Sequence, residues 1–140
     1  MKLERSIYLK KKFPKLTNSE SEMMEVLWNA DKPLTSSKIV AMSQGQTWKP
    51  SYVHILINSL LKKEMIEVAG FEQSTKNYAR TFQPTISRDA YIAGQVQQTM
   101  SESAMSALFA ACVDTTANEA LIDDLSEKLA KRKKELESKE

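Results

Sequence analysis

The 140-residue chain has very little of several residue types on which common sites depend. Its one cysteine, Cys112, excludes a disulfide within the chain. Together with the one histidine, His54, it supplies too few soft ligands for a zinc or copper site. The three glycines are scattered singly, which excludes a glycine-rich phosphate loop. With no catalytic constellation either, we expect no enzyme activity, no metal and no cofactor.

Long apolar runs are also missing. No stretch approaches the roughly 20 residues of a membrane-spanning helix. The basic N-terminus, MKLERSIYLKKKF, lacks the long apolar core of a signal peptide. Apolar residues make up 41% of the chain and charged residues 27%, which is typical of a globular domain. We therefore expect a cytoplasmic protein that has no membrane partner.

Charge is divided unevenly along the chain. Residues 1–84 hold 13 Lys and Arg against 8 Asp and Glu, a net charge of +5. Residues 85–140 hold 7 against 10, a net charge of −3. One interpretation is a basic half that meets a polyanion and an acidic half with another task. A split of this size also arises by chance, so it decides nothing alone.

Helix signals occur three times in the first half. The capping box of Thr17 and Glu20 precedes an apolar run and predicts a helix of about three turns that ends near Pro33. A short second helix covers Thr35–Met42, with one of its first two residues as the N-cap. A third helix begins at Pro50, because proline suits the first helical position.

A hairpin follows the third helix. Short strands are predicted at residues 66–70 and 78–82, and the polar stretch 72–77 joins them. Helix, short helix, helix and hairpin, in this order, are typical of a winged helix-turn-helix. The predicted fold is therefore mainly α with a small β-hairpin wing. We place this winged domain at residues 16–86, after a basic N-terminal extension at 1–15.

A helical wheel divides the third helix into two faces. The apolar stripe, which we expect to be buried, consists of Val53, Leu56, Ile57, Leu60 and Leu61. The opposite face carries small, amide and basic groups without an acid, and consists of Ser51, Ile55, Asn58 and Lys62, flanked by His54 and Ser59. Such a face suits DNA, because a carboxylate is repelled by phosphates and an asparagine can pair with an adenine edge. An ordinary solvated face is the alternative interpretation.

We assign DNA contacts to both helices of the helix-turn-helix and to the wing. In this hypothesis Ser51, Ile55 and Asn58 meet bases. The lysines around the third helix meet phosphate, and the wing follows the backbone or the minor groove. The full set of candidates is Lys38, Lys49, Ser51, Tyr52, His54, Ile55, Asn58, Lys62, Lys63, Lys76, Asn77 and Arg80.

Residues 87–140 are predicted to form a helical dimerisation domain. Apolar residues recur at helical spacing, with a break near Ser101 and a last helix from Thr116 or Asn118. So short an arm cannot fold alone, and we expect it to bury its apolar residues against a second copy. Cys112 is expected to be a small buried side chain, with a thiol sensor as the alternative. The candidate interface residues are Ile92, Val96, Met105, Leu108, Phe109, Ile122, Leu125 and Leu129.

Several short motifs occur at distinctive distances from one another between residues 16 and 91. They are Glu20–Trp28 in the first helix, Lys32–Thr35 before the second, Trp48 before the third, Val53, Leu56, Asn58 and Leu60 within it, Lys62, Lys63 and Ile66 after it, and Phe82–Pro84 at the end of the hairpin. Together they resemble the penicillinase-repressor family, which includes beta-lactamase, methicillin-resistance and copper-responsive repressors. Residues 88–137 resemble the family only in helical pattern and length.

The resemblance implies a homodimeric repressor. It implies that the winged domain binds double-stranded operator DNA with TACA and TGTA halves and that the C-terminal helices hold the dimer together. The family usually has threonines and an arginine in the third helix, where this chain has Tyr52, Ile55 and Ser59. Glu64 replaces a family glycine. These departures concern the operator sequence and not the fold.

Release from DNA follows different routes within the family. Penicillinase-type members are cut between Asn and Phe in the dimer domain, where this chain has Ala110 and Ala111. Copper-responsive members carry a C-terminal cysteine cluster, which this chain lacks. We therefore expect a repressor of a palindromic operator that another signal releases, with an inducing protease or sensor as a candidate partner. A winged-helix module that binds a protein and no DNA is the alternative.

Overall fold

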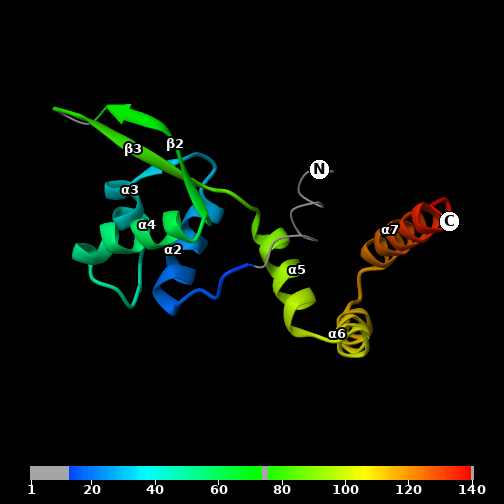
Figure 1. The fold of residues 1–140 in the computed structure, drawn as a ribbon. Coiled ribbons are helices and arrows are strands. Elements are labelled where there is room, and N and C mark those ends of the chain that lie inside the picture. The colour runs from blue at the N-terminus through cyan, green and yellow to red at the C-terminus, as the bar shows by residue number, and fades with distance from the viewer. Residues whose placement is uncertain (1–12, 74–75, 140) are drawn as a thin grey trace. The chain divides into compact units, whose positions relative to one another are not determined.

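The computed structural model describes residues 13–73 and 76–139 and divides the chain into two compact units (Figure 1). The first unit ends at Gln98 and the second begins at Thr99. Most of the basic extension predicted at residues 1–15 lies outside the described residues.

Two capped helices open the first unit. α2 (Asn18–Asn29) begins with the predicted capping box. In this box the Thr17 hydroxyl accepts a hydrogen bond from the Glu20 N–H at 3.2 Å, and the Glu20 carboxylate accepts one from the Thr17 N–H at 2.8 Å. α3 (Ser36–Met42) has Thr35 as its N-cap, and its hydroxyl accepts from the N–H three residues later at 3.3 Å. Both predicted helix starts are confirmed.

The third helix begins with a tighter turn. Pro50–Tyr52 is a 3-10 helix, η1, and α4 (Val53–Lys62) follows it. The prediction of an α-helix from Pro50 is therefore wrong for this first turn. Lys49 occupies the N-cap without a capping side chain, and its carbonyl accepts from the Tyr52 N–H at 2.8 Å. This hydrogen bond closes the three-residue turn.

Three antiparallel strands form one sheet in the order β1-β3-β2. β2 (Ile66–Gln73) and β3 (Tyr78–Pro84) make the predicted hairpin, and both extend past their predicted ends. β1 (Leu34–Thr35) pairs with β3 and is absent from the sequence-based prediction, because two residues carry no alternation pattern. The hairpin projects from the helices as the wing (Figure 1).

One apolar core stabilises the winged domain. The predicted stripe of α4 supplies part of it: Val53, Ile57 and Leu60 are buried, and Leu56 and Leu61 are partly buried. This burial confirms the helical-wheel prediction. The other core residues are Phe13, Met23, Met24, Leu27, Leu34, Ile39, Trp48, Met65, Ile66, Phe82, Ile86 and Ala90.

The helix after the wing also packs on this core. This helix, α5 (Arg88–Thr99), places the ring of Tyr91 5.7 Å from that of Trp28 and 5.8 Å from that of Phe13. Gly94 is buried against Phe13, so close that an added Cβ would lie 2.1 Å from its ring. The first unit consequently extends further along the chain than the predicted winged domain.

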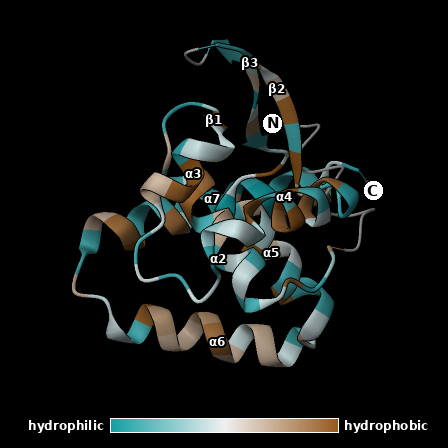
Figure 2. Cartoon of the chain, turned by 90° about the vertical axis from the view of Figure 1, so that its left-hand side faces the viewer, coloured by the Kyte–Doolittle hydropathy of each residue, from teal (hydrophilic) through white to brown (hydrophobic). Residues whose placement is uncertain are grey.

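The second unit consists of α6 (Glu102–Thr115) and α7 (Glu119–Glu137). Ser101 and Asn118 are their N-caps, which confirms the predicted break and the predicted start of the last helix. Neither helix has a buried residue, although α6 contains many apolar residues (Figure 2). Cys112 is exposed, so the prediction of a buried thiol is wrong for the single chain, because the cleft that it lines stays open to solvent.

Candidate nucleic-acid interface

The outward face of η1 and α4 gathers the side chains that the sequence assigns to bases. The buried stripe fixes this orientation, because a rotation of the helix would move apolar side chains into water. Two large side chains stay in water on this face: Ile55 is 59% exposed and Tyr52 is 50% exposed. The segment Pro50–Lys62 contains no acid. Its exposed candidates are Ser51, Tyr52, His54, Ile55, Asn58 and Lys62.

The loop before η1 is anchored to α2. The Glu22 carboxylate accepts hydrogen bonds from the Thr47 N–H at 2.9 Å and from the Thr47 hydroxyl at 3.3 Å. Trp48 is buried in the core, and Lys49 next to it is exposed. These contacts fix the place at which the third helix begins and leave the Lys49 ammonium on the surface.

The far end of α4 is anchored by Glu20, which is 2% exposed. Its carboxylate accepts hydrogen bonds from the Ser59 hydroxyl and the Lys63 ammonium, each at 2.6 Å. Burial raises the pKa of Glu20, but hydrogen bonds from Lys63, Ser59 and Thr17 outweigh it and lower the pKa to about 2. The Lys63 ammonium also donates to the Lys15 carbonyl at 3.1 Å. Two of its three N–H groups are thus engaged within the chain.

Lys38 likewise has a partner inside the domain. Its ammonium on α3 forms an ion pair with the Glu72 carboxylate on β2. The hydrogen bond from Lys38 is the main cause that lowers the pKa of Glu72. The pair links the helix-turn-helix to the wing, and it offsets the negative charge that Glu72 brings to the wing.

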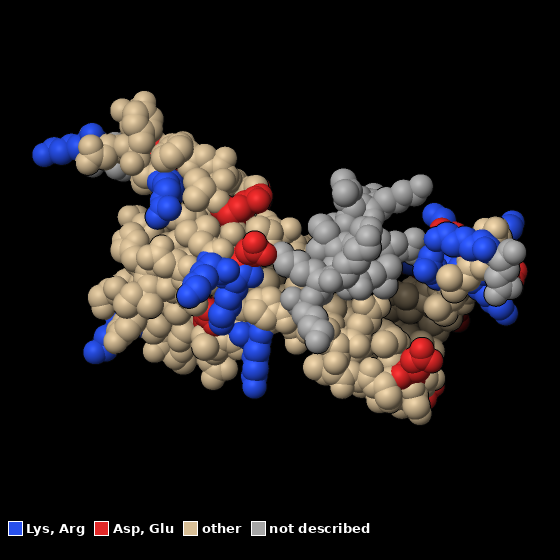
Figure 3. Space-filling model, viewed as in Figure 1, with Lys and Arg blue, Asp and Glu red and all other residues tan. Residues whose placement is uncertain are grey.

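The predicted DNA contacts of the wing, two basic residues and one amide, are exposed near its tip. They are Lys76, Asn77 and Arg80. The guanidinium carbon of Arg80 lies 5.3 Å from the centre of the Phe82 ring, a cation–π contact that supports the stem of this side chain. Basic side chains are visible at the tip of the wing in Figure 3. The wing therefore presents positive charge at its outer end.

Two aromatic side chains of the wing are missing from the predicted contacts. Phe71 is 68% exposed and Tyr78 is 71% exposed. The strand register shifts between Val68 and Gly70, so the alternation of sides changes within β2. Such a bulge cannot be located from this sequence. Two aromatic residues in an otherwise polar hairpin tip are the signal that points to them.

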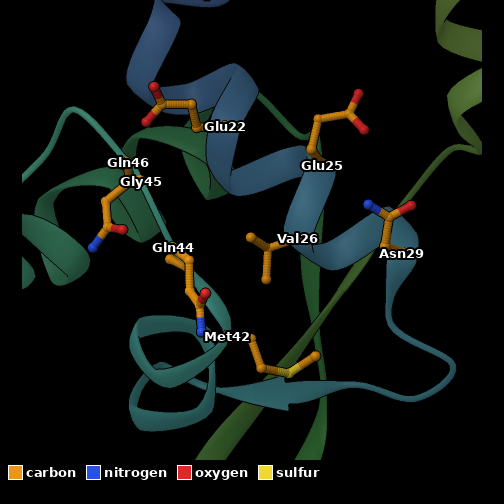
Figure 4. Close-up of a pocket in the computed structure, with 9 residues that line it drawn as sticks. Glu22, Glu25, Val26, Asn29, Met42, Gln44, Gly45 and Gln46 are labelled. Carbon is orange, nitrogen blue, oxygen red and sulfur yellow. The ribbon is translucent and has the colours of Figure 1, made fainter.

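A hollow of about 460 Å³ lies between α2 and the loop after α3 (Figure 4). Val26 and Met42 contribute apolar surface to it, and Glu22 and Glu25 contribute carboxylates. Glu22 binds the loop as described above, and Glu25 pairs with Arg88. Both carboxylates are thus engaged within the chain, and we assign no ligand to this hollow.

Two other kinds of feature are absent from the part of the chain that the structure describes. Within residues 13–73 and 76–139, no three His, Cys, Asp or Glu side chains are grouped closely enough to share a metal ion. None of the helices in these ranges is long and apolar enough to cross a membrane. The surface of α4 and the wing therefore stands out as the candidate site.

Comparison with known families shows to which family the chain belongs. The family model described as penicillinase repressor matches residues 16–131. The chain belongs to the penicillinase repressor family. The resemblance of its motifs to this family is thereby confirmed. The penicillinase repressor of Bacillus licheniformis is 32% identical over 53 residues, which are 38% of this chain and 41% of that relative. The match thus spans less than half of that relative.

Several solved structures are distantly similar to this penicillinase repressor family member. Streptococcus pneumoniae FabT in complex with DNA has a TM-score of 0.42 at 15% identity, covering 99% of this chain and 87% of that chain. MepR, a transcription regulator of the Staphylococcus aureus multidrug efflux pump MepA, has a TM-score of 0.41 at 14% identity, covering 96% and 90%. The assignment of family rests on the family match and not on these structures.

The candidate dimer residues are distributed over both units. On α5 in the first unit, Ile92 is 52% exposed and Val96 is partly buried. In the second unit a cleft of about 410 Å³ between α6 and α7 is lined by Phe109, Leu125 and Leu129 among others. The remaining candidates on these two helices are Met105, Leu108 and Ile122. Apolar surface in the second unit is therefore open to solvent in a single chain.

Proposed function

We infer that this family member is a homodimeric repressor that binds a two-fold symmetric operator in double-stranded DNA. The observation that carries the proposal is the outward face of α4, which has hydroxyl, amide, imidazole and ammonium groups and no carboxylate. Hydroxyls and amides match base edges, and ammonium groups match phosphates. In this proposal Ser51, Ile55 and Asn58 meet bases in the major groove, with the Asn58 amide suited to adenine and Ile55 to a thymine methyl.

Phosphate contacts surround this base-reading face. Lys49 and Lys62 are exposed at the two ends of the third helix, which suits them to the two sides of the major groove. Lys63 has one N–H group left for a phosphate after its contacts with Glu20 and Lys15. Lys38, which pairs with Glu72, contributes mainly by holding the wing. The basic tip of the wing adds phosphate contacts outside the half-site.

The second unit supports the dimer. Its large apolar side chains remain exposed in the single chain, and contiguous exposed apolar surface is typical of an association site. A second copy of this chain supplies a matching face, because a two-fold interface uses the same surface on both partners. Two winged domains held together bind a palindrome with a large effective concentration, whereas one domain binds a half-site weakly. Any signal that separates the two dimerisation domains, whether a protease, a ligand or a partner protein, therefore releases the repressor from its operator.

The test is selection of bound duplexes from a random-sequence DNA pool with the full chain. The proposal expects a palindrome whose half-sites lie about one helical turn, or a multiple of it, apart. The Asn58→Ala variant serves as the control and should lose preference at one position of each half-site. If the full chain enriches no sequence, the DNA-binding proposal is overturned, and a protein-binding winged helix becomes the better assignment.

A further inference from the structure

The wing carries aromatic surface that the fold does not use. Phe71 and Tyr78 are 68% and 71% exposed, and neither belongs to the apolar core. Burial of a side chain of this size is worth about 1.5–3 kcal/mol. Both residues therefore leave a large apolar area in water that a partner can cover.

The strand register brings these two rings to the same side of the hairpin. Phe71 pairs with Arg80, and Gln73 pairs with Tyr78. Residues directly opposite one another point to the same face of a hairpin, and so do residues two apart on one strand. The outer end of the wing thus has one face with two aromatic rings, a guanidinium and an amide.

The charge of this aromatic face favours an anionic partner. Arg80 lies on the face, and Lys76 lies in the loop beside it. Glu72 pairs with Lys38 on α3, and the carboxylate of Glu67, nearer the base of β2, accepts a hydrogen bond from Gln83. A partner that covers this face must therefore combine apolar surface with negative charge. Nucleic acid does so, because sugars and base edges lie between its phosphates.

The length of the wing indicates which part of a duplex it reaches. Phe71 lies five residues beyond Ile66, the first residue of β2, which is about 17 Å along an extended strand. The major groove is about 12 Å wide. With α4 in the major groove, the outer end of the wing extends past the phosphate ridge to the neighbouring minor groove. An acidic protein surface has no comparable geometric link to α4.

We propose that Phe71 and Tyr78 form an apolar contact with the minor groove next to each half-site, and that this contact selects DNA by its deformability. The proposal rests on the proposed function, because it requires α4 to lie in the major groove. Aromatic side chains that press into the minor groove favour base steps that open or kink easily. The wing then contributes sequence preference at positions that α4 does not touch.

The test compares the full chain with the double variant Phe71→Ala/Tyr78→Ala on a random-sequence duplex pool. The double variant should keep the positions selected by α4 and lose the preference at the flanking positions. Its affinity for the selected duplex should fall about tenfold, a loss of 1.4 kcal/mol. The dependence of affinity on salt should stay unchanged, because aromatic contacts release no counterions from phosphates.

Matched variants separate this role from folding and from charge. Gln83→Ala removes a polar side chain near the base of the hairpin, away from its outer end, and should leave affinity and flanking preference unchanged. Tyr78→Phe keeps the ring and should behave like the original chain. Equal flanking preference in the original chain and the double variant overturns this proposal alone. Failure of the original chain to enrich any sequence overturns the proposed function as well, so the two failures are distinguishable.

Discussion

The carboxylate of Glu20 and the ammonium of Lys63 lie 2.6 Å apart and join the first turn of α2 to the C-terminal end of α4. Glu20 is 2% exposed, whereas the Lys63 side chain is 29% exposed. The carboxylate is thus taken out of water while the ammonium stays at the surface. Removal of one partner of such a buried pair is costly, because the other charge loses its compensation. The pair consequently holds the C-terminal end of α4 against the first turn of α2.

The first prediction concerns the Glu20 carboxylate. Glu20→Gln keeps the shape of the side chain and removes its charge, so it weakens the hydrogen bonds from Ser59 and Lys63. The variant should lose about 1–3 kcal/mol of unfolding free energy at neutral pH. Urea unfolding followed by tryptophan fluorescence measures this loss. A variant as stable as the original chain would show that the pair contributes nothing net.

The same carboxylate predicts how stability depends on pH. The pKa of Glu20 is lowered from 4.5 to about 2 in the folded chain. The stabilisation from its ionised form is therefore complete above about pH 4.5 and is lost as the pH falls towards 2. The expected loss is on the order of 3 kcal/mol. Comparison with Glu20→Gln over this pH range isolates the contribution of Glu20, and parallel curves for the two chains would contradict it.

This contact also marks where inference from the sequence stops. The capping box of Thr17 and Glu20 is a local signal, so the sequence predicts it and the helix that it starts. Lys63, the partner of Glu20 directly after α4, lies 43 residues away, and nothing local pairs the two residues. Lys63 is consequently interpreted from the sequence as a phosphate contact. In the structure its ammonium is engaged mainly within the domain.

The wing illustrates the same limit for strands. Alternation and turn residues predict a hairpin between residues 66 and 82, and the structure has one. The register shift between Val68 and Gly70 decides which side Phe71 occupies, and it depends on pairing with β3 that the sequence does not specify. The polar face of α4 is predicted well, because a helical wheel needs only the period of the helix.

The second prediction tests base reading by α4. Asn58→Ala removes an amide from the exposed face without disturbing the buried stripe. It should cost about 1–3 kcal/mol of binding to the selected operator and relax the preference at one base pair, with little effect on random DNA. Lys62→Ala is the matched control and should weaken all sequences alike. Equal weakening of operator and random DNA by Asn58→Ala would remove Asn58 from the base contacts.

The third prediction tests the charge of the wing. Lys76→Ala combined with Arg80→Ala removes two cations that the proposal places against phosphates. The slope of log affinity against log salt should become shallower by roughly 0.9 for each phosphate that is no longer neutralised. Binding measured over a range of salt concentrations gives this slope. An unchanged slope would place both side chains outside the DNA interface.

The fourth prediction concerns the packing of α5 on the core. A Cβ at Gly94 would lie 2.1 Å from the ring of Phe13, so Gly94→Ala must displace that ring. We expect a loss of about 1–3 kcal/mol of unfolding free energy, which exceeds the gain of about 1 kcal/mol in helix propensity. Gly70→Ala is the control, because its Cβ meets nothing nearer than the Thr81 hydroxyl at 3.9 Å. Similar unfolding curves for the two variants would contradict this account.

The fifth prediction tests the dimer arm. Leu125 is 38% exposed and Leu129 is 72% exposed in the single chain, and both line the cleft between α6 and α7. In the proposed dimer this surface is covered, and Leu125→Lys with Leu129→Lys buries two unpaired charges, which is strongly unfavourable. The variant should sediment as a monomer and lose tight operator binding, while circular dichroism still reports a folded winged domain.

A matched change of charge separates this effect from electrostatics. The double variant adds two positive charges, and Glu127→Lys changes the charge of α7 by the same amount. Glu127 lies on the opposite side of the helix, because two residues correspond to about 200° of rotation at 3.6 residues per turn. Glu127→Lys should therefore remain dimeric and bind the operator. If the double variant also stays dimeric and binds the operator normally, the dimer interface does not include Leu125 and Leu129. The dimer interface would then have to involve Met105, Leu108 and Phe109 on α6.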